Sequence, residues 1–229
     1  MKKVILITGA SKGLGKELCK LFLENDYDVI GTYHNTFSCD DKIDYQKCDL
    51  SNENDITNLF NYINDKYHHL DVLINNAALC QDNDFDHKTS DEFKKVLNVN
   101  LIGTFLMIKY FSKIMDNGCI VNISSLDAED TYSPLSIDYA ASKAGVENLT
   151  KNISSILSNL KVVALAPAWI DTETVLEMET HYLEDEMKKH HQERLLNKEN
   201  VAKKILDIVN DNKYKSGMII RMEDDNEYR

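Results

Sequence analysis

The fold of this chain is decided near its start, by the stretch Val4-Ile5-Leu6-Ile7-Thr8-Gly9-Ala10-Ser11-Lys12-Gly13-Leu14-Gly15. An apolar run typical of a buried strand passes directly into a turn with three glycines and then into an amphipathic segment. Glycines in such a turn allow a tight bend and let a pyrophosphate approach backbone N–H groups at the helix N-terminus. A plain strand-to-helix turn is the alternative, but the position after an N-terminal strand favours a nucleotide site.

The same turn argues against ATP bound through a P-loop. A P-loop ending in Gly15-Lys16 needs a glycine at position 10 and a serine or threonine at position 17, where the chain has Ala10 and Glu17. A dinucleotide is therefore the better candidate.

Short β-rich runs alternate with longer amphipathic stretches along the whole chain. This pattern predicts one doubly wound α/β domain of the Rossmann type over residues 1–229, with about seven parallel strands and helices on both faces. The expected strands are Lys3 to Thr8, Asp28 to Tyr33, Ile43 to Cys48, Val72 to Asn75, Cys119 to Ser124, Val162 to Ala166 and Met218 to Arg221. The expected helices are Gly13 to Asn25, Ile56 to Lys66, Ser90 to Met115, Tyr139 to Ser158 and Asn200 to Asn210.

The segment 173–194 differs from its surroundings because it is strongly charged. Val175, Met178, Tyr182, Leu183 and Met187 recur in it at roughly helical spacing. The segment is expected to form one or two helices over a site, as a substrate lid, although an ordinary amphipathic surface helix would have the same periodicity.

The composition limits the kinds of partner that the protein is expected to bind. A chain of 229 residues with 43% hydrophobic and 28% charged residues is typical of a single globular domain. Its formal net charge of −12 opposes binding to nucleic acid or to an anionic membrane. Small molecules are the expected ligands.

The cysteines and histidines indicate neither disulfides nor a metal site. The five cysteines are scattered without metal-ligand spacing and are expected to be buried thiols of a cytoplasmic protein; they are Cys19, Cys39, Cys48, Cys80 and Cys119. The pairs His68-His69 and His190-His191 are adjacent and would point apart on a helix. No signal peptide or membrane-spanning run is evident.

Tyr139 and Lys143 are four residues apart in a predicted helix, so their side chains are expected on one face. A nearby ammonium favours phenolate, and Lys143 is therefore expected to lower the pKa of Tyr139 toward neutrality. The spacing alone also occurs where a tyrosine simply packs under a solvated lysine.

With these motifs the chain resembles the short-chain dehydrogenase/reductase family, and it is especially similar to bacterial carbonyl reductases of the 3-oxoacyl-carrier-protein reductase type. The resemblance covers nearly the whole chain and rests on six motifs in the family's order. They are Thr8-Gly9-x-x-x-Gly13-x-Gly15, Asn75-Asn76-Ala77-Ala78, Asn100-Leu101-x-Gly103, Ile123-Ser124-Ser125, Tyr139-x-x-x-Lys143 and Pro167-Ala168-Trp169-Ile170-Asp171-Thr172.

The resemblance implies catalytic roles for four residues. Tyr139 would exchange a proton with the substrate oxygen, while Lys143 would hold the nicotinamide ribose and stabilise the phenolate. Ser125 would donate a hydrogen bond to the carbonyl oxygen, with Ser124 as the alternative. Asn100 would hold a water that links Lys143 to solvent, unless it is a buried asparagine satisfied by backbone groups.

The resemblance also implies a set of cofactor contacts. They are Gly9, Ser11, Lys12, Gly13, Leu14, Gly15, Tyr33, His34, Asp49, Leu50, Asn76, Ala77, Ala78, Tyr139, Lys143, Pro167, Ala168, Trp169, Ile170 and Thr172. The second strand ends without an acid, and Lys12 adds a cation, which favours NADP(H) over NAD(H). A mostly neutral imidazole at His34 is a weaker phosphate partner than the arginine often found there.

The chain departs from the family pattern in three places. The interval from Ser125 to Tyr139 is one position longer than in many relatives. Ala78 and Ala168 replace glycines, so a positive φ would be costly there and a different loop geometry is expected. The loops after the fourth and fifth strands are acidic, which disfavours an acidic substrate or carrier protein; the acids are Asp82, Asp84, Asp86, Asp127, Glu129 and Asp130.

The expected activity is NADP(H)-dependent hydride transfer to a ketone or aldehyde, or from a secondary alcohol, in a homodimer or homotetramer. A 3-oxoacyl compound is one candidate substrate. An NAD-dependent alcohol or polyol dehydrogenase is the alternative enzyme. A dinucleotide-binding sensor or scaffold without catalysis is the alternative of another class, which the complete set of catalytic side chains disfavours.

Overall fold

A single parallel sheet forms the centre of the molecule. The computed structural model describes residues 2–37, 40–129, 133–189 and 191–228. Its seven strands follow the order β3-β2-β1-β4-β5-β6-β7, so the direction of winding reverses beside β1. The strands are β1 (Lys3–Ile7), β2 (Tyr27–Tyr33), β3 (Asp44–Lys47), β4 (Val72–Asn75), β5 (Cys119–Ile123), β6 (Lys161–Pro167) and β7 (Ile219–Met222). The predicted doubly wound α/β fold is confirmed.

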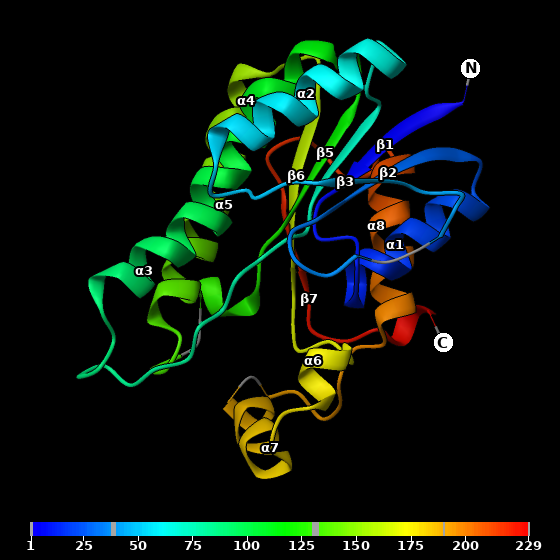
Figure 1. Ribbon diagram of the computed structural model, residues 1–229. Coiled ribbons are helices and arrows are strands. Elements are labelled where there is room, and N and C mark those ends of the chain that lie inside the picture. Colours follow the sequence, from blue (N-terminus) through cyan, green and yellow to red (C-terminus); the bar gives the residue numbers. More distant parts are fainter. Residues whose placement is uncertain (1, 38–39, 130–132, 190, 229) are drawn as a thin grey trace.

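Helices cover both faces of the sheet because the strands bury side chains on both faces (Figure 1). Ile5 and Ile7 of β1 pack in the cluster that contains α1 and α8, whereas Val4 and Leu6 pack in the cluster that contains α2, α4 and α5. The helices are α1 (Gly13–Glu24), α2 (Glu53–Tyr67), α4 (Thr104–Phe111), α5 (Ile137–Ile156) and α8 (Lys198–Asn210).

The predicted helix from Ser90 to Met115 is found as one helical run that ends at Ile114, but it is not α-helical throughout. The structure has α3 (Ser90–Leu97), a π-helical stretch (Asn98–Gly103), α4 and a 3₁₀ turn (Ser112–Ile114). The widened turn coincides with Asn100, whose side chain is bonded to the backbone of Leu79. Such π-helical insertions often occur at functional sites, and apolar periodicity does not reveal them. The other predicted strands and helices have bounds within three residues of those found.

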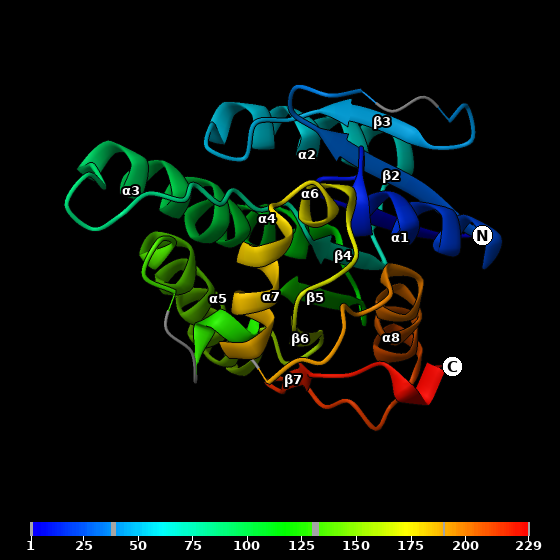
Figure 2. The ribbon, with the colours of Figure 1, turned by 90° about the horizontal axis from the view of Figure 1, so that it is seen from below.

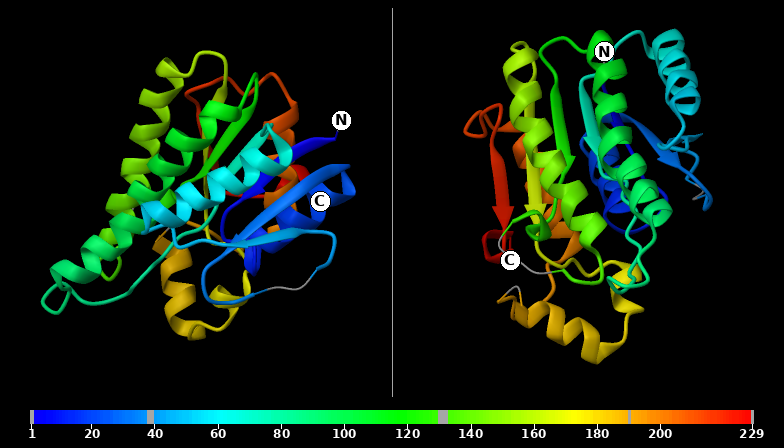
Figure 3. Two further views of the ribbon diagram at one scale, coloured as in Figure 1. Left: turned by 45° about the horizontal axis from the view of Figure 1, so that its top comes forward. Right: turned by 90° about the vertical axis from the view of Figure 1, so that its left-hand side faces the viewer.

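Two short helices, α6 (Glu173–Leu176) and α7 (Thr180–Lys189), lie across the carboxyl ends of the strands (Figures 2 and 3). Both belong to the charged segment 173–194, which was expected to form one or two helices and forms two. Since ligands of open α/β sheets bind outside the carboxyl ends of the strands, these helices stand over the expected site.

Candidate active site

A pocket of about 720 Å³ opens at the carboxyl ends of the strands. The glycine-rich turn lines one end of it, here called the cofactor end, and Ser125 and Tyr139 line the other, called the substrate end. The structure brings almost all the predicted cofactor residues together there. The lining includes Gly9, Ser11, Lys12, Gly13, Leu14, Gly15, Tyr33, His34, Asp49, Leu50, Asn76, Ala77, Ala78, Pro167, Ala168, Trp169, Ile170 and Thr172.

The glycine-rich turn has the shape that a dinucleotide requires. Gly9 has φ +66°, and its N–H donates to the Thr32 hydroxyl at 3.2 Å. A Cβ on Gly15 would lie 2.1 Å from the Gly9 carbonyl oxygen, so only glycine lets the turn close this tightly against α1. The backbone thus leaves the N-terminus of α1 facing the pocket, where a pyrophosphate fits.

A carboxylate lies at that helix N-terminus in the structure. The Gly13 N–H donates to Glu173 Oε2 at 3.0 Å, and Lys198 Nζ donates to Glu173 Oε1 at 2.9 Å. The hydrogen bond from Lys198 is the largest reason that the pKa of Glu173 lies below its usual value. Lys12 Nζ, for its part, donates to Thr174 at 3.2 Å. The start of α6 is therefore bonded to the glycine-rich turn, a contact between distant segments that the sequence did not reveal.

The adenosine part of the cofactor end carries charges of both signs. His34 Nε2 lies 3.5 Å from Asp49 Oδ2, and Lys95 lines the same pocket. His34 is thus placed beside a carboxylate. Ala78 and Ala168, which replace family glycines, were expected to avoid a positive φ, and both do so. Among the described residues, the positions other than glycine with a positive φ are Asp26, His68, Asn117 and His191.

Tyr139 and Lys143 lie one turn apart on α5, with Lys143 Nζ 5.3 Å from the centre of the Tyr139 ring. The ammonium is buried and donates to the Ile123 carbonyl oxygen at 2.7 Å. The Ser125 hydroxyl lies near enough to the Tyr139 phenol to lower its pKa. Ser124 instead donates to Glu147 Oε1 at 3.0 Å. Of the two serines, Ser125 is therefore the one that faces the phenol.

The pKa of Tyr139 is raised in this structure, which contradicts the expected shift toward neutrality. Burial is the largest cause, and the charge of Asp127 and the Cys80 thiol add to it, while the hydrogen bond with Ser125 opposes it. Burial also lowers the pKa of Lys143 to about 8. Burial outweighs the charge of Asp127, which acts in the opposite direction on Lys143. In this buried site the cost of desolvation therefore exceeds the attraction between ammonium and phenolate.

The side-chain amide of Asn100 is bonded to protein groups at both of its polar atoms. Its Oδ1 accepts from the Leu79 N–H at 2.7 Å, and its Nδ2 donates to the Leu79 carbonyl oxygen at 2.9 Å and to Ser142 Oγ at 3.0 Å. Both amide hydrogens are thus used, so the side chain fits the alternative reading of a buried, backbone-satisfied asparagine. Its position fixes the loop after β4 against α5.

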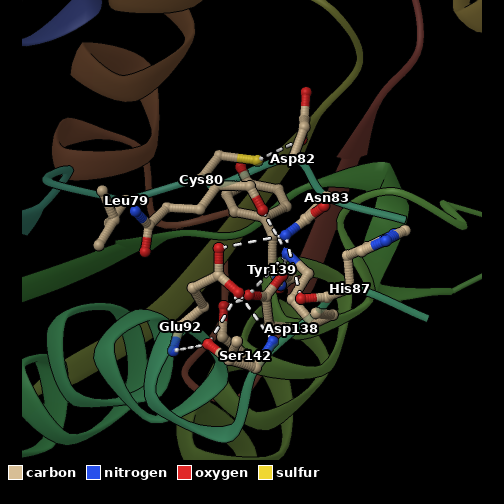
Figure 4. A network of polar contacts seen from close by, with 12 residues as sticks. Leu79, Cys80, Asp82, Asn83, His87, Glu92, Asp138, Tyr139 and Ser142 are labelled. Carbon is tan, nitrogen blue, oxygen red and sulfur yellow. Dashed lines mark hydrogen bonds and ion pairs between the residues drawn. The ribbon is translucent and has the colours of Figure 1, made fainter. Parts of the chain in front are cut away.

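The same loop is tied to α5 by a buried ion pair. Lys88 Nζ lies 3.1 Å from Asp138 Oδ2, with side-chain exposures of 3% and 0%. Lys88 also donates to the Gln81 carbonyl oxygen, and Asp138 Oδ1 accepts the Tyr139 N–H at 3.0 Å. Figure 4 shows Cys80 of this loop beside Asp138 and Tyr139. Sequence reasoning missed this pair, because Lys88 lies in a polar loop with nothing to mark it as buried.

The substrate end also contains side chains that the sequence placed only loosely. Val175, Met178 and Tyr182 of the segment 173–194 line the pocket, together with Glu186. Of the acidic loop residues, Asp82 and Asp127 line the pocket, and Asp130 lies outside the described residues. Burial raises the pKa of Tyr182, and the charges of Asp82, Glu186 and Asp127 raise it further.

Within the described ranges, no three His, Cys, Asp or Glu side chains are grouped to hold a metal ion. Nor does any helix in this part of the chain combine the length and hydrophobicity needed to cross a membrane. Four described cysteines are free thiols; Cys19, Cys48 and Cys119 are buried as expected, but Cys80 is exposed at the pocket. Cys39 and His190 fall outside the described residues.

Comparison with known proteins places this geometry among oxidoreductases. Residues 3–183 match the model of a family described as short chain dehydrogenase. The 3-oxoacyl-[acyl-carrier-protein] reductase FabG of Thermotoga maritima is 31% identical, and the alignment covers 96% of each chain. The ligand-free aldohexose dehydrogenase of Thermoplasma acidophilum is 26% identical with a TM-score of 0.87, covering 98% of this chain and 93% of that one. A structure of ElxO with NADP bound is 30% identical with a TM-score of 0.81, covering 99% and 98%.

Proposed function

Because the chain belongs to the short-chain dehydrogenase/reductase family, we propose that it is an NADP(H)-dependent oxidoreductase that reduces a ketone or an aldehyde. The observation that carries the proposal is the shape of one pocket. It joins a glycine-rich helix N-terminus, fit for a pyrophosphate, to a Ser125, Tyr139 and Lys143 cluster at its other end. When bound, the nicotinamide would supply the hydride.

The residues of the substrate end would handle the proton. Tyr139 would donate its hydroxyl proton to the substrate oxygen, and Ser125 would hold that oxygen with a hydrogen bond. Lys143, once it turns from the Ile123 carbonyl oxygen, would hold the ribose hydroxyls and stabilise the phenolate that remains. Asn100 and Lys88 would fix the wall around these groups, since both bond to the loop after β4.

The preference for NADP(H) rests on Lys12, on the lack of an acid at the end of β2 and on the similarity to the NADP-bound ElxO structure. The contact of His34 with Asp49 favours the alternative, an NAD-dependent alcohol or polyol dehydrogenase, because a carboxylate repels the 2′-phosphate. The similarity to an aldohexose dehydrogenase points the same way. Initial rates with NADH and NADPH at equal concentration separate the two, and a clear preference for NADH would refute our choice.

A 3-oxoacyl compound is one candidate substrate, since the Thermotoga maritima relative is named for reducing such a group. Asp82 and Asp127 at the pocket disfavour an acidic carrier protein. The segment 173–194 would act as the substrate lid, because its residues line the substrate end. We further propose a cytoplasmic homodimer or homotetramer. Ile102 and Phe105, 46% and 42% exposed on one stretch, are apolar surface that a second copy would cover.

The proposal is tested with Tyr139→Phe. The variant should lose at least about 100-fold in turnover of any carbonyl that the wild type reduces, because the proton donor is gone. NADPH binding should stay nearly intact. Retained turnover would overturn the mechanism, and NADPH binding without hydride transfer to any carbonyl would favour the sensor or scaffold reading.

A further inference from the structure

Asp127 stands beside the catalytic serine in a way that the proposed function does not require. It lies on the 3₁₀ turn Leu126–Ala128, directly after Ser125. Its Oδ2 accepts the Ser125 hydroxyl at 3.1 Å, and its N–H donates to the same Oγ at 3.2 Å. Its Oδ1 accepts the Ser133 hydroxyl at 2.8 Å. The carboxylate is therefore fixed at the substrate end, where it lines the pocket.

These bonds settle the orientation of Ser125. A serine hydroxyl has one hydrogen and two lone pairs. In this structure the hydrogen goes to Asp127, while one lone pair takes the Asp127 N–H. The oxygen is thus clamped from two sides, and the hydroxyl has only to turn its hydrogen to meet a substrate oxygen.

The charges that face Tyr139 come from three elements. Asp127 comes from the turn after β5, and the Cys80 thiol from the loop after β4. Lys143, on the same helix as the phenol, has its ammonium nitrogen 5.3 Å from the centre of the phenol ring. Asp82 and Glu186 stand farther across the pocket, around Tyr182. A carboxylate next to a phenol opposes phenolate formation, and Asp127 accordingly raises the pKa of both Tyr139 and Lys143.

We propose that Asp127 is a positioning residue that clamps the Ser125 hydroxyl and places a negative charge in the pocket that Tyr139 also lines. The inference rests on the proposed carbonyl reduction. In that reduction the bound nicotinamide would supply a hydride, with its electron pair, for the new C–H bond at the carbonyl carbon. The Tyr139 O–H bond breaks as its proton joins the carbonyl oxygen, leaving an alcohol, oxidised cofactor and a phenolate that solvent reprotonates. Asp127 fixes the pH range over which that phenol keeps its proton.

Two variants separate the clamp from the charge. Asp127→Asn keeps an oxygen that accepts the Ser125 hydroxyl but removes the charge, whereas Asp127→Ala removes both. Glu129→Gln is the matched control, because Glu129 lies in the same loop, is exposed and binds Arg221. Each protein is assayed for NADPH-dependent reduction across pH, with the carbonyl that the wild type reduces.

Asp127→Asn should move the alkaline limb of kcat/KM down by about one pH unit while leaving kcat on the plateau within about threefold. Asp127→Ala should show the same shift and lose about tenfold in kcat, because Ser125 is no longer held. Glu129→Gln should match the wild type. A purely structural role would lower the rate without moving the limb, so an Asp127→Asn profile that superimposes on the wild type overturns the charge role. Wild-type kcat in Asp127→Ala overturns the clamp.

A second readout does not depend on turnover. NADPH affinity, followed by fluorescence, should weaken above the pKa of Lys143, and Asp127→Asn should move this transition to lower pH by about one unit. Unmoved binding would contradict the inference even if the rates agreed with it. Activity retained by Tyr139→Phe would instead refute the proposed function, while the shift in binding would still report the charge of Asp127. Absence of the binding transition in the wild type would overturn the influence of Asp127 on Lys143 and would leave the proposed carbonyl reduction to the Tyr139→Phe test.

Discussion

The two ends of the pocket are held together by different interactions. At the cofactor end, backbone packs on backbone so closely that Gly15 has no room for a Cβ beside the Gly9 carbonyl. At the substrate end, charged side chains join separate segments, as where Lys88 and Asp138 tie the loop after β4 to α5. The cofactor end therefore depends on close packing and the substrate end on buried charge. Substitutions at the two ends should have different effects on stability and on cofactor binding.

Breaking the buried charge pair should have the largest effect on stability. Lys88→Met leaves Asp138, which is 0% exposed, without its cation, and should cost about 3–5 kcal/mol of unfolding free energy. Urea unfolding measures this. The double variant Lys88→Met with Asp138→Asn should recover most of the loss. Lys94→Met, at the exposed pair with Asp91, is the control and should cost less than about 1 kcal/mol. Equal losses of unfolding free energy in Lys88→Met and Lys94→Met would contradict the view that buried charge holds the substrate end together.

The same contrast explains what the sequence allowed us to predict. The cofactor end can be predicted from residues that are neighbours in the sequence. Thr8 to Gly15 indicate the end of a strand, a tight turn and the start of a helix within one short stretch. Alternating buried positions such as Val4, Ile5 and Leu6 give the two-faced parallel sheet. The fold and the cofactor lining were therefore accessible, and only the π-helical stretch around Asn100 escaped the periodicity.

The substrate end depends on pairings between distant residues, which no local pattern encodes. Lys88 and Asp138 lie fifty positions apart. The spacing of Tyr139 and Lys143 placed both on one helix face correctly. It did not reveal that burial would outweigh their attraction, because burial is a property of the assembled site.

A substitution that changes the shape of the cofactor end should cost less unfolding free energy than the broken ion pair. It should have a greater effect on NADPH binding. Gly15→Ala forces the turn open against the Gly9 carbonyl oxygen, and should cost about 1–3 kcal/mol by urea unfolding. NADPH binding should be lost over the accessible concentration range, because the pyrophosphate site is deformed. Lys16→Ala, exposed on the same helix, should change neither quantity. Wild-type NADPH affinity in Gly15→Ala would show that the close packing is not needed for the cofactor.

Lys143 is where the two ends meet, and its titration should be visible in cofactor binding. Burial lowers the pKa of this lysine to about 8, so the ammonium that would bond the ribose exists below that pH and is lost above it. NADPH affinity of the wild type should therefore fall as pH rises through about 8. Lys143→Met should bind about tenfold more weakly at pH 7 and show no such transition. Lys151→Met, exposed on the same helix, should keep the wild-type curve. An affinity independent of pH in the wild type would exclude a charged Lys143 as a ribose contact.

The smallest effect is expected where charge intrudes on the cofactor end. Glu173 Oε2 accepts the Gly13 N–H that a phosphate oxygen would use, so the carboxylate both occupies the donor and repels the anion. Glu173→Gln should therefore bind NADPH about twofold to fivefold more tightly at low salt, with a smaller gain at high salt. Glu177→Gln, at the other end of α6, should leave the affinity unchanged. Weaker binding by Glu173→Gln would mean that the carboxylate supports the turn through Lys198 and does not compete with the phosphate. The cofactor end would then also depend on a charged pair, although an exposed one.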